Sequence, residues 1–496
     1  MKQYLLGIDI GTSGCKAALF DKGGAVICQA TKPYKVFYPQ SGFAEQNPDD
    51  WWAAVCLAIK EILDSNGIKS GEIAGIGVDG QSWSAIAVDK DGNVLCPTPI
   101  WMDTRAADIC EELDREIGEE SIFNLCGNPL KPSYTSPKIL WYKKHRPEMY
   151  SKIHTVLQSN SFIVYRLTGV ITQEKSQGYG WHCFDMRKNT WDMEMCGKMG
   201  ISTSLLPDIL DCHQIAGTVT EKAAELTGLM AGTPVVAGGL DAACATLGAG
   251  VLHAGETQEQ GGQAGGMSIC IDKYNSDIRL ILGSHVVPGK WLLQGGTVGG
   301  GGVIEWFDRE FGSGDFKVLD ALASEINPGA DGMVFLPYMA GERSPIWDMN
   351  ARGVYYGINF AKTKGHFIRS SLEGVAFSLK HNLEVAEQAG ASVEKLFSVG
   401  GAANSKLWTQ IKSDITGKPI EVPSSDTAAT LGAAMLAGVG TGLYKDFEEA
   451  VGSTVKITKQ YEPNPLNLPV YSEAYQTYLE LYKQLKPIMD KRGHAN

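Results

Sequence analysis

Two aspartates each follow an apolar run and stand beside small residues, a setting in which a carboxylate can reach a bound ligand. Asp9 comes just after residues 5–8 and precedes the turn Gly-Thr-Ser-Gly at residues 11–14. The N–H groups of such a turn can hold an anion, and a carboxylate next to a phosphate requires a cation such as Mg²⁺ between them. The sequence therefore suggests a phosphate and metal site, with a tight hairpin and a solvated aspartate as an equally supported alternative.

Asp241 is the second such aspartate. It follows an apolar run at residues 233–237 and the pair Gly238-Gly239, and it begins a predicted helix of small residues. At the carboxyl end of a strand a carboxylate faces the ligand crevice and can accept a proton as a general base. An aspartate at the start of a helix can also do no more than cap it. The pattern supports the base and the cap equally.

Polar and aromatic side chains suited to a carbohydrate follow two further strand-like runs. Sugar sites combine an aromatic ring against C–H groups with charged groups that bind hydroxyls. The alternatives are a Trp83 that only fills the core and an Asp103 that only caps a helix predicted over residues 106–117. The candidate substrate residues are Gln81, Ser82, Trp83, Asp103 and Arg105.

Two glycine-rich segments lie in the second half of the chain. Residues 258–266 read QEQGGQAGG and repeat the opening theme of a glycine turn beside a strand, which suggests duplicated domains. Residues 396–405 read LFSVGGAANS, a strand followed by a Gly-Gly corner where a nucleoside can lie against bare backbone. A tight strand-to-helix turn is the alternative there. The first turn, at residues 11–14, matches neither G-x-x-x-x-G-K-[ST] nor G-x-G-x-x-G.

Length and composition narrow the class of protein. A chain of 496 residues exceeds what one core usually supports, so at least two domains are expected. A net charge of −12 disfavours nucleic acid and anionic membranes as partners. The 11 cysteines include no C-x-x-C pair, which indicates reduced thiols in a cytoplasmic protein rather than a zinc site. We expect neither a secretory signal nor a membrane-spanning helix.

Hydrophobic spacing predicts the elements that carry these residues. A hairpin is expected over residues 5–20, after which the sequence turns polar up to Asn47 and no element is predicted. Long helices are expected over residues 366–390 and over residues 471–492, the second bent near Pro487. The mixed segment between about residues 133 and 210 is interpreted as an insertion that walls the substrate side.

Two longer motifs resemble the signature sequences of a known family. Residues 133–145, SYTSPKILWYKKH, match its first signature except for Tyr142, and residues 353–373 fit its second signature throughout. With these motifs the chain resembles the FGGY carbohydrate kinases over its whole length, and within them most closely the xylulokinase branch. The resemblance implies an α/β fold of two actin-like, ribonuclease-H-like ATPase domains around a central cleft. The expected domains are residues 1–247, with the sugar side and the first phosphate hairpin, and residues 248–496, with the nucleotide side.

The resemblance also implies a role for each candidate residue, with ATP and Mg²⁺ as the cofactors. Asp241 corresponds to the catalytic base, and Asp9 to the residue that positions the metal ion. The substrate contacts correspond to Gln81, Ser82, Trp83, Asp103 and Arg105. The ATP-binding residues correspond to Gly11, Thr12 and Ser13 of the first phosphate hairpin, to Gly262 and Gln263 of the second, and to Gly400, Gly401, Ala402 and Ser405 of the adenosine motif.

Three departures from the xylulokinase pattern concern the ligands. Ser82-Trp83 replaces Met-His, Ala242 replaces the Asn after the catalytic aspartate, and Gln263-Ala264 replaces Thr and Ser in the second turn. The implied reaction is transfer of the γ-phosphate of ATP to a hydroxyl of a ketose, D-xylulose first, with ribulose, erythritol or a similar polyol as the alternative. A scaffold ATPase without a sugar acceptor is the alternative from another class. A homodimer is left open.

Overall fold

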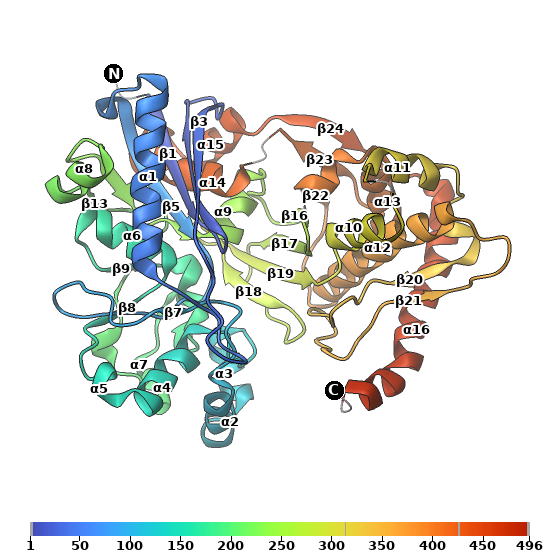
Figure 1. Ribbon diagram of the computed structural model, residues 1–496, viewed down its shortest axis with the longest axis horizontal. Coiled ribbons are helices and arrows are strands. Elements are labelled where there is room, and N and C mark those ends of the chain that lie inside the picture. Colours follow the sequence, from blue (N-terminus) through green and yellow to red (C-terminus); the bar gives the residue numbers. More distant parts are fainter. Residues whose placement is uncertain (1–2, 313, 425–426, 494–496) are drawn as a thin grey trace.

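The computed structural model describes residues 3–312, 314–424 and 427–493. Two seven-stranded sheets, each flanked by helices, stand side by side (Figure 1). The first half of the chain builds the sheet on the left of the view, and the second half builds the one on the right. This is the two-domain α/β arrangement expected from the sequence.

The first sheet has the predicted hairpin at its centre. β1 (Tyr4–Ile10) pairs antiparallel with β2 (Gly14–Phe20) and parallel with β5 (Ile73–Gly80). Helices α1 (Pro48–Asn66) and α6 (Ser159–Thr168) cover one face. The remaining strands are β3 (Val26–Pro33), β13 (Ile215–Thr218), β14 (Pro234–Val236) and β15 (Gly239–Leu240). The polar segment before Asn47 thus contains a strand, β3, because its exposed edge position permits polar side chains.

The second sheet repeats the same pairing. β16 (Glu256–Gly261) pairs antiparallel with β17 (Gly265–Ile271) and parallel with β22 (Lys395–Val399). Helix α12 (Lys364–Gln388) packs against β17 and against α13 (Lys406–Thr416). The other strands are β18 (Ile281–Ser284), β19 (Trp291–Thr297), β23 (Ile420–Pro423) and β24 (Ile457–Tyr461).

Smaller elements surround the two sheets. β6 (Ile86–Val88) pairs with β8 (Thr155–Leu157) apart from the main sheet. On the left-hand side lie α2 (Ala107–Glu116), α3 (Glu119–Cys126), α4 (Thr135–His145), α5 (Pro147–Tyr150), α7 (Met193–Met199) and α8 (Glu221–Thr227). Short strand pairs are β4 (Glu45–Gln46) with β7 (Thr98–Pro99), β9 (Thr172–Glu174) with β12 (Asp208–Leu210), and β10 (Phe184–Asp185) with β11 (Thr190–Trp191). The later elements are α9 (Asp241–Gly248), α10 (Gly301–Phe311), α11 (Phe316–Ser324), β20 (Val334–Leu336), β21 (Val354–Tyr356), α14 (Ala428–Gly440), α15 (Phe447–Thr454) and α16 (Leu468–Gly493).

Helix α14 joins the two halves. It comes from the second half of the chain but packs on β1, β5 and α9 of the first half (Figure 1). The approach is so close that a Cβ on Gly77 of β5 would lie 1.9 Å from the carbonyl oxygen of Ala433. Where the helices cross, a Cβ on Gly432 of α14 would lie 1.9 Å from the carbonyl oxygen of Cys244. Glycine is therefore required for the backbones to touch.

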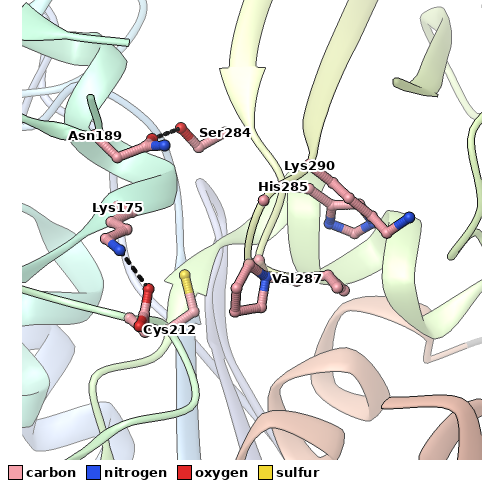
Figure 2. A pocket seen from close by; sticks show the side chains of 11 residues that line it. Lys175, Asn189, Cys212, Ser284, His285, Val287 and Lys290 are labelled. Atoms are coloured by element: carbon pink, nitrogen blue, oxygen red, sulfur yellow. Dashed lines mark hydrogen bonds and ion pairs between the residues drawn. The ribbon is translucent and has the colours of Figure 1, made fainter. Parts of the chain in front are cut away.

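A second contact holds the edge strand β18 against the first half. The Asn128 side chain donates to the carbonyl oxygen of Leu282 (2.8 Å) and accepts from its N–H (3.0 Å), as a paired strand would. Ser284 donates to Asn189 at 2.7 Å, and Figure 2 shows these two side chains facing each other across the contact. The cavity beside them encloses only ≈ 20 Å³, room for about one water molecule, so this is a packing contact.

Within the described residues, no helix combines the length and the apolar character needed to span a bilayer.

The α14 crossing gives a stability prediction. We expect Gly432→Ala to lower the free energy of unfolding by about 1–3 kcal/mol, because the added methyl group meets backbone that cannot move aside. The measurement is the apparent midpoint of thermal unfolding. The matched control is Gly452→Ala, also within a helix, where a Cβ meets nothing within 4 Å and alanine favours the helix. Equal midpoints for the two variants would show that the crossing tolerates a side chain.

Candidate active site

Three aspartates meet at one edge of the first sheet. β1, β5 and β15 are parallel, so their carboxyl ends lie at the same edge. Asp9 of β1 pairs in register with Asp79 of β5, and Asp79 pairs in register with Gly239 of β15. Asp241 follows two residues later, as the first residue of α9. The sheet thus brings the two predicted aspartates together and adds Asp79, to which the sequence analysis gave no role.

Burial raises the pKa of all three carboxyl groups. For Asp241 the pKa rises to about 7, and the negative charge of Asp9 adds to the effect of burial. The pKa of Asp9 is raised, and that of Asp79 is raised well above its usual value with further contributions from Asp9 and Asp241. The groups therefore lie close enough to sense one another.

The carboxylate of Asp241 is not a conventional helix cap. Its Oδ1 accepts a hydrogen bond from the N–H of the next residue, Ala242, at 2.6 Å, whereas a cap would bond two or three residues further on. The kink before it depends on Gly238, whose φ is +84° and where a Cβ would lie 2.0 Å from the carbonyl oxygen of Val78. Asp241 is partly exposed to solvent, as a group that meets a ligand must be.

Side chains that are distant in sequence form hydrogen bonds to the first glycine turn. Tyr34 donates to the carbonyl oxygen of Gly11 at 2.6 Å. Gln46 donates to the carbonyl oxygen of Thr12 at 2.8 Å, and Trp101 donates to the Thr12 hydroxyl at 2.9 Å. In the described part of the chain, the N–H groups of Thr12 and Ser13 have no acceptor. They remain available for an anion.

The Asp9 carboxylate lies directly beside this turn. A Cβ on Gly11 would stand 3.9 Å from both Asp9 carboxylate oxygens. An anion held by the turn would therefore meet the carboxylate, which is the arrangement that calls for a cation.

The second glycine turn and the Gly-Gly corner are also adjacent. Gly301 and Gly302, at the start of α10, donate to the carbonyl oxygens of Gly262 (2.7 Å) and Gln263 (2.9 Å). A Cβ on Gly400 would lie 2.9 Å from the carbonyl oxygen of Gly261. The predicted residues Gly262, Gln263, Gly400, Gly401 and Ala402 therefore form one surface.

Ser405 stands one turn further on, at the start of α13. Its hydroxyl donates to Asp320 at 2.7 Å and accepts from the N–H of Trp408 at 3.1 Å. This hydroxyl is already engaged as a helix cap.

Gln81 is linked to the first glycine turn. Its side-chain amide donates to Gln46 at 2.8 Å, and Gln46 in turn holds Thr12. The side-chain oxygen of Gln81 is buried without a donor among the described residues. A ligand hydroxyl would satisfy it.

Trp83 lies in an aromatic cluster beside Asp241. Its ring stacks on Tyr134 with centroids 4.1 Å apart, and Tyr179 meets it edge-on at 5.7 Å. Asp241 is close enough to raise the pKa of Tyr179, after burial, and Ser82 hydrogen-bonds Tyr179. Trp83 adopts φ of +60°, a strained backbone conformation for a bulky residue.

Lys138 of α4 supports this strained position. Its ammonium group donates to the carbonyl oxygens of Trp83 and Ile100, both at 2.8 Å, and its side chain is 0% exposed. Burial lowers its pKa to about 7. This amino group forms no salt bridge within the described part of the chain, and its hydrogen bond fixes the carbonyl group of Trp83.

Asp103 and Arg105 bind each other. Asp103 accepts from Arg105 Nε at 2.9 Å and from Nη2 at 2.7 Å, and Nη2 also contacts Glu45 at 2.7 Å. The guanidinium stacks on Phe43, 3.8 Å from the ring centroid. Asp103 also accepts a hydrogen bond from the N–H of Ala44. Asp103 does not cap α2, because no side chain forms a cap hydrogen bond at the start of that helix.

The structure therefore gathers most predicted site residues and adds several that sequence reasoning missed. The additions are Tyr34, Gln46, Asp79, Trp101, Tyr134, Lys138 and Tyr179. Only Asp79 had a local signal, since it is a carboxylate at the end of an otherwise apolar strand. The others act through contacts formed by distant segments.

Comparison with known proteins identifies the same architecture over the whole chain. The models for the N- and C-terminal domains of the FGGY family of carbohydrate kinases match residues 4–248 and 274–441. The chain is 30% identical to the xylulose kinase of Bacillus subtilis over 98% of both chains. The xylulose kinase structure from Rhodospirillum rubrum superposes with a TM-score of 0.92 at 29% identity, covering 98% of this chain and 100% of the other. A gluconokinase of Bacillus subtilis is 28% identical over 99% of this chain and 97% of its own.

Lys138 gives a prediction of pH-dependent stability. Its folded pKa of about 7 lies below the value of about 10.4 in an unfolded chain. Between these values the unfolded chain binds more protons, so this residue makes the free energy of unfolding rise with pH, by at most about 1.4 kcal/mol per unit. Lys138→Met should remove that rise. The measurement is urea unfolding of both proteins from about pH 7 to about pH 9.

The control for this comparison is Lys60→Met, on the exposed face of α1, which should leave the slope unchanged. Parallel pH profiles for Lys138→Met and the parent protein would contradict a depressed lysine pKa.

Proposed function

The chain belongs to the FGGY family of carbohydrate kinases and is an ATP-dependent sugar kinase, and we propose that its acceptor is a ketose, with D-xylulose first. The observation that carries the proposal is the partly exposed Asp241 carboxylate, which lies at the same sheet edge as Asp9 and its glycine turn and beside the aromatic cluster at Trp83. Relatives named xylulose kinase support the choice of ketose. Ribulose or a small polyol such as erythritol is the alternative within the class.

In this proposal Asp241 is the general base. A sugar hydroxyl is a weak nucleophile, and a carboxylate that accepts its proton as the bond to phosphorus forms contributes about 10²–10⁴-fold. With a pKa of about 7, the group is basic enough to take the proton and still ionised at neutral pH. The aromatic rings of Trp83 and Tyr179 exclude water and orient the sugar, with Gln81, Ser82, Asp103 and Arg105 as proposed hydroxyl contacts.

ATP is proposed to lie between the two glycine turns. The N–H groups of residues 12 and 13 would hold one phosphate, and the turn at Gly262 and Gln263 would hold another through backbone donors. The Gly400–Ala402 corner would hold the adenosine, next to the second turn. Because Ser405 already caps α13, its contribution is to fix this corner.

The residues present fit a magnesium ion at Asp9. Its Oδ1 is buried with no donor among the described residues, which suits a cation. The described residues contain no cluster of three or more His, Cys, Asp or Glu side chains able to hold a metal, which agrees with Mg²⁺ bound mainly by phosphates and water. The ion would neutralise charge on the transferring phosphoryl group.

The domain assignment belongs to the same proposal. Residues 1–247 would carry the sugar and the base, and residues 248–496 the nucleotide, with closure of the halves excluding water. The family-model matches at residues 4–248 and 274–441 support this division. The net charge of −12 disfavours nucleic acid and anionic membranes as partners, and the dispersed cysteines support a cytoplasmic location.

The acceptor is tested by measuring ADP release with and without a panel of sugars. We expect D-xylulose to stimulate release most, with ribulose and erythritol weaker. Gluconate is the necessary competitor, because a gluconokinase is among the relatives. Highest kcat/KM with gluconate would overturn the ketose, and release indifferent to every sugar would indicate a scaffold ATPase.

The role of Asp241 gives a further prediction. Asp241→Asn should lower kcat on the best sugar by about 10²–10⁴-fold while ADP affinity changes little, since the amide cannot accept the proton. In the parent enzyme kcat/KM should rise with pH up to about 7, as the carboxyl group ionises. The exposed Asp64→Asn is the control. Near-normal turnover of Asp241→Asn would reduce this residue to a structural role.

A further inference from the structure

Asp79 is a buried carboxylate that has no role in the reaction proposed above. It is 0% exposed, and among the described residues neither of its carboxylate oxygens has a donor other than a protonated Asp9. Asp9 Oδ1, on the neighbouring strand, is orphaned in the same way. Three buried carboxylate oxygens thus lie on adjacent strands, and no described residue outside the pair donates to them.

The two side chains project from the same face of the sheet. Asp9 and Asp79 are register partners on parallel strands, so their side chains point the same way. Two residues earlier on each strand, Gly7 and Gly77 face the backbone of α14. Asp9 and Asp79 therefore lie on that face one step further along, at the edge where the first glycine turn begins.

Such a pair is unfavourable without a compensating partner. Two adjacent ionised carboxylates shielded from water repel each other, and the hydrogen bond between their side chains requires a proton on one of them. Lys16, opposite Asp9 on β2, favours the ionised form of Asp9 but forms no ion pair with it. The missing partner is either a proton shared by the two groups or a cation held between them.

The placement favours a cation. The pair stands beside the turn proposed to hold phosphate, where a divalent ion is required on other grounds. Asp241 differs from the pair, because its Oδ1 accepts a hydrogen bond from the N–H of Ala242 and its residue is partly exposed to solvent. Two carboxylates leave the other coordination positions of an octahedral ion to phosphate oxygens and water, which Mg²⁺ prefers to an all-protein cage.

We propose that Asp79 is the second carboxylate anchor of the nucleotide-bound divalent cation, acting together with Asp9. This inference rests on the proposed function, since it assigns a further residue to the metal of that site. It distinguishes Asp79 from Asp241, which acts on the sugar hydroxyl.

The test is binding of Mn²⁺ in the presence of ADP, followed by the loss of the electron paramagnetic resonance signal of free Mn²⁺ and by competition with Mg²⁺. We expect Asp79→Asn to weaken Mn²⁺ binding about 10-fold or more, because the amide keeps the shape but loses the charge. Asp241→Asn removes a neighbouring, partly exposed carboxylate from the same sheet edge and should change the affinity by less than about 3-fold.

Each result decides the question. Parent-like Mn²⁺ affinity in Asp79→Asn would overturn the proposal and indicate a carboxyl group that holds a proton. Equal weakening of Mn²⁺ binding by Asp79→Asn and Asp241→Asn would also overturn the proposal, because it would indicate an effect of lost negative charge and not of a specific ligand. If Asp79→Asn does not fold, Asp79→Ser is measured under the same criteria. A parent protein that binds Mn²⁺ with ADP through Asp79 but phosphorylates no sugar would refute the proposed acceptor and leave this inference standing.

Discussion

The negative charge gathered where β1, β5 and β15 end is the constraint on which the site depends. Burial raises the pKa of all three aspartates there, and the charge of Asp9 adds to the effect at Asp79 and Asp241. Phosphate brought to such an edge is repelled unless backbone N–H groups and a cation offset the charge. The glycine turn at residues 11–14 provides the first of these, and it is braced by Tyr34, Gln46 and Trp101 so that its N–H groups stay directed outward. Burial, with the charge of Asp9 in addition, raises the pKa of Asp241 to about 7, which suits the proton abstraction proposed for it.

The sugar side is organised differently, around a strained residue rather than around charge. Trp83 holds a positive φ, which the fold maintains by stacking the ring on Tyr134 and by fixing the carbonyl group with Lys138. These partners come from the segment that the sequence analysis interpreted as an insertion walling the substrate. Ser82-Trp83 departs from the pattern of the xylulokinase branch, and the structure shows that the departure is built into a supporting framework.

Local patterns predicted the parts of the structure that local physics determines. Apolar runs on either side of a glycine turn predicted the β1–β2 hairpin, and hydrophobic spacing predicted the long helices α12 and α16. Position after an apolar strand predicted Asp9 and Asp241. Pairing between distant segments could not be foreseen: Arg105 of the Asp103–Arg105 pair also contacts Glu45 and Phe43, and β6 pairs with β8 apart from the main sheet. β3 was missed because an edge strand carries polar side chains. The sequence shows Asp79 at the end of an apolar run, but it does not show whether the folded chain supplies a hydrogen-bond donor to that carboxylate.

The position of α14 has a consequence for how this chain can be divided. Residues 428–440 belong to the second half in sequence, yet they cover the glycine rows of β1 and β5. A fragment that stops near residue 248 would leave that backbone surface bare, and the complementary fragment would carry a helix with no sheet beneath it. The halves can therefore fold as a pair of associating fragments but not as independent modules. A movement of the halves that keeps the α9–α14 crossing in place would leave this backbone contact undisturbed.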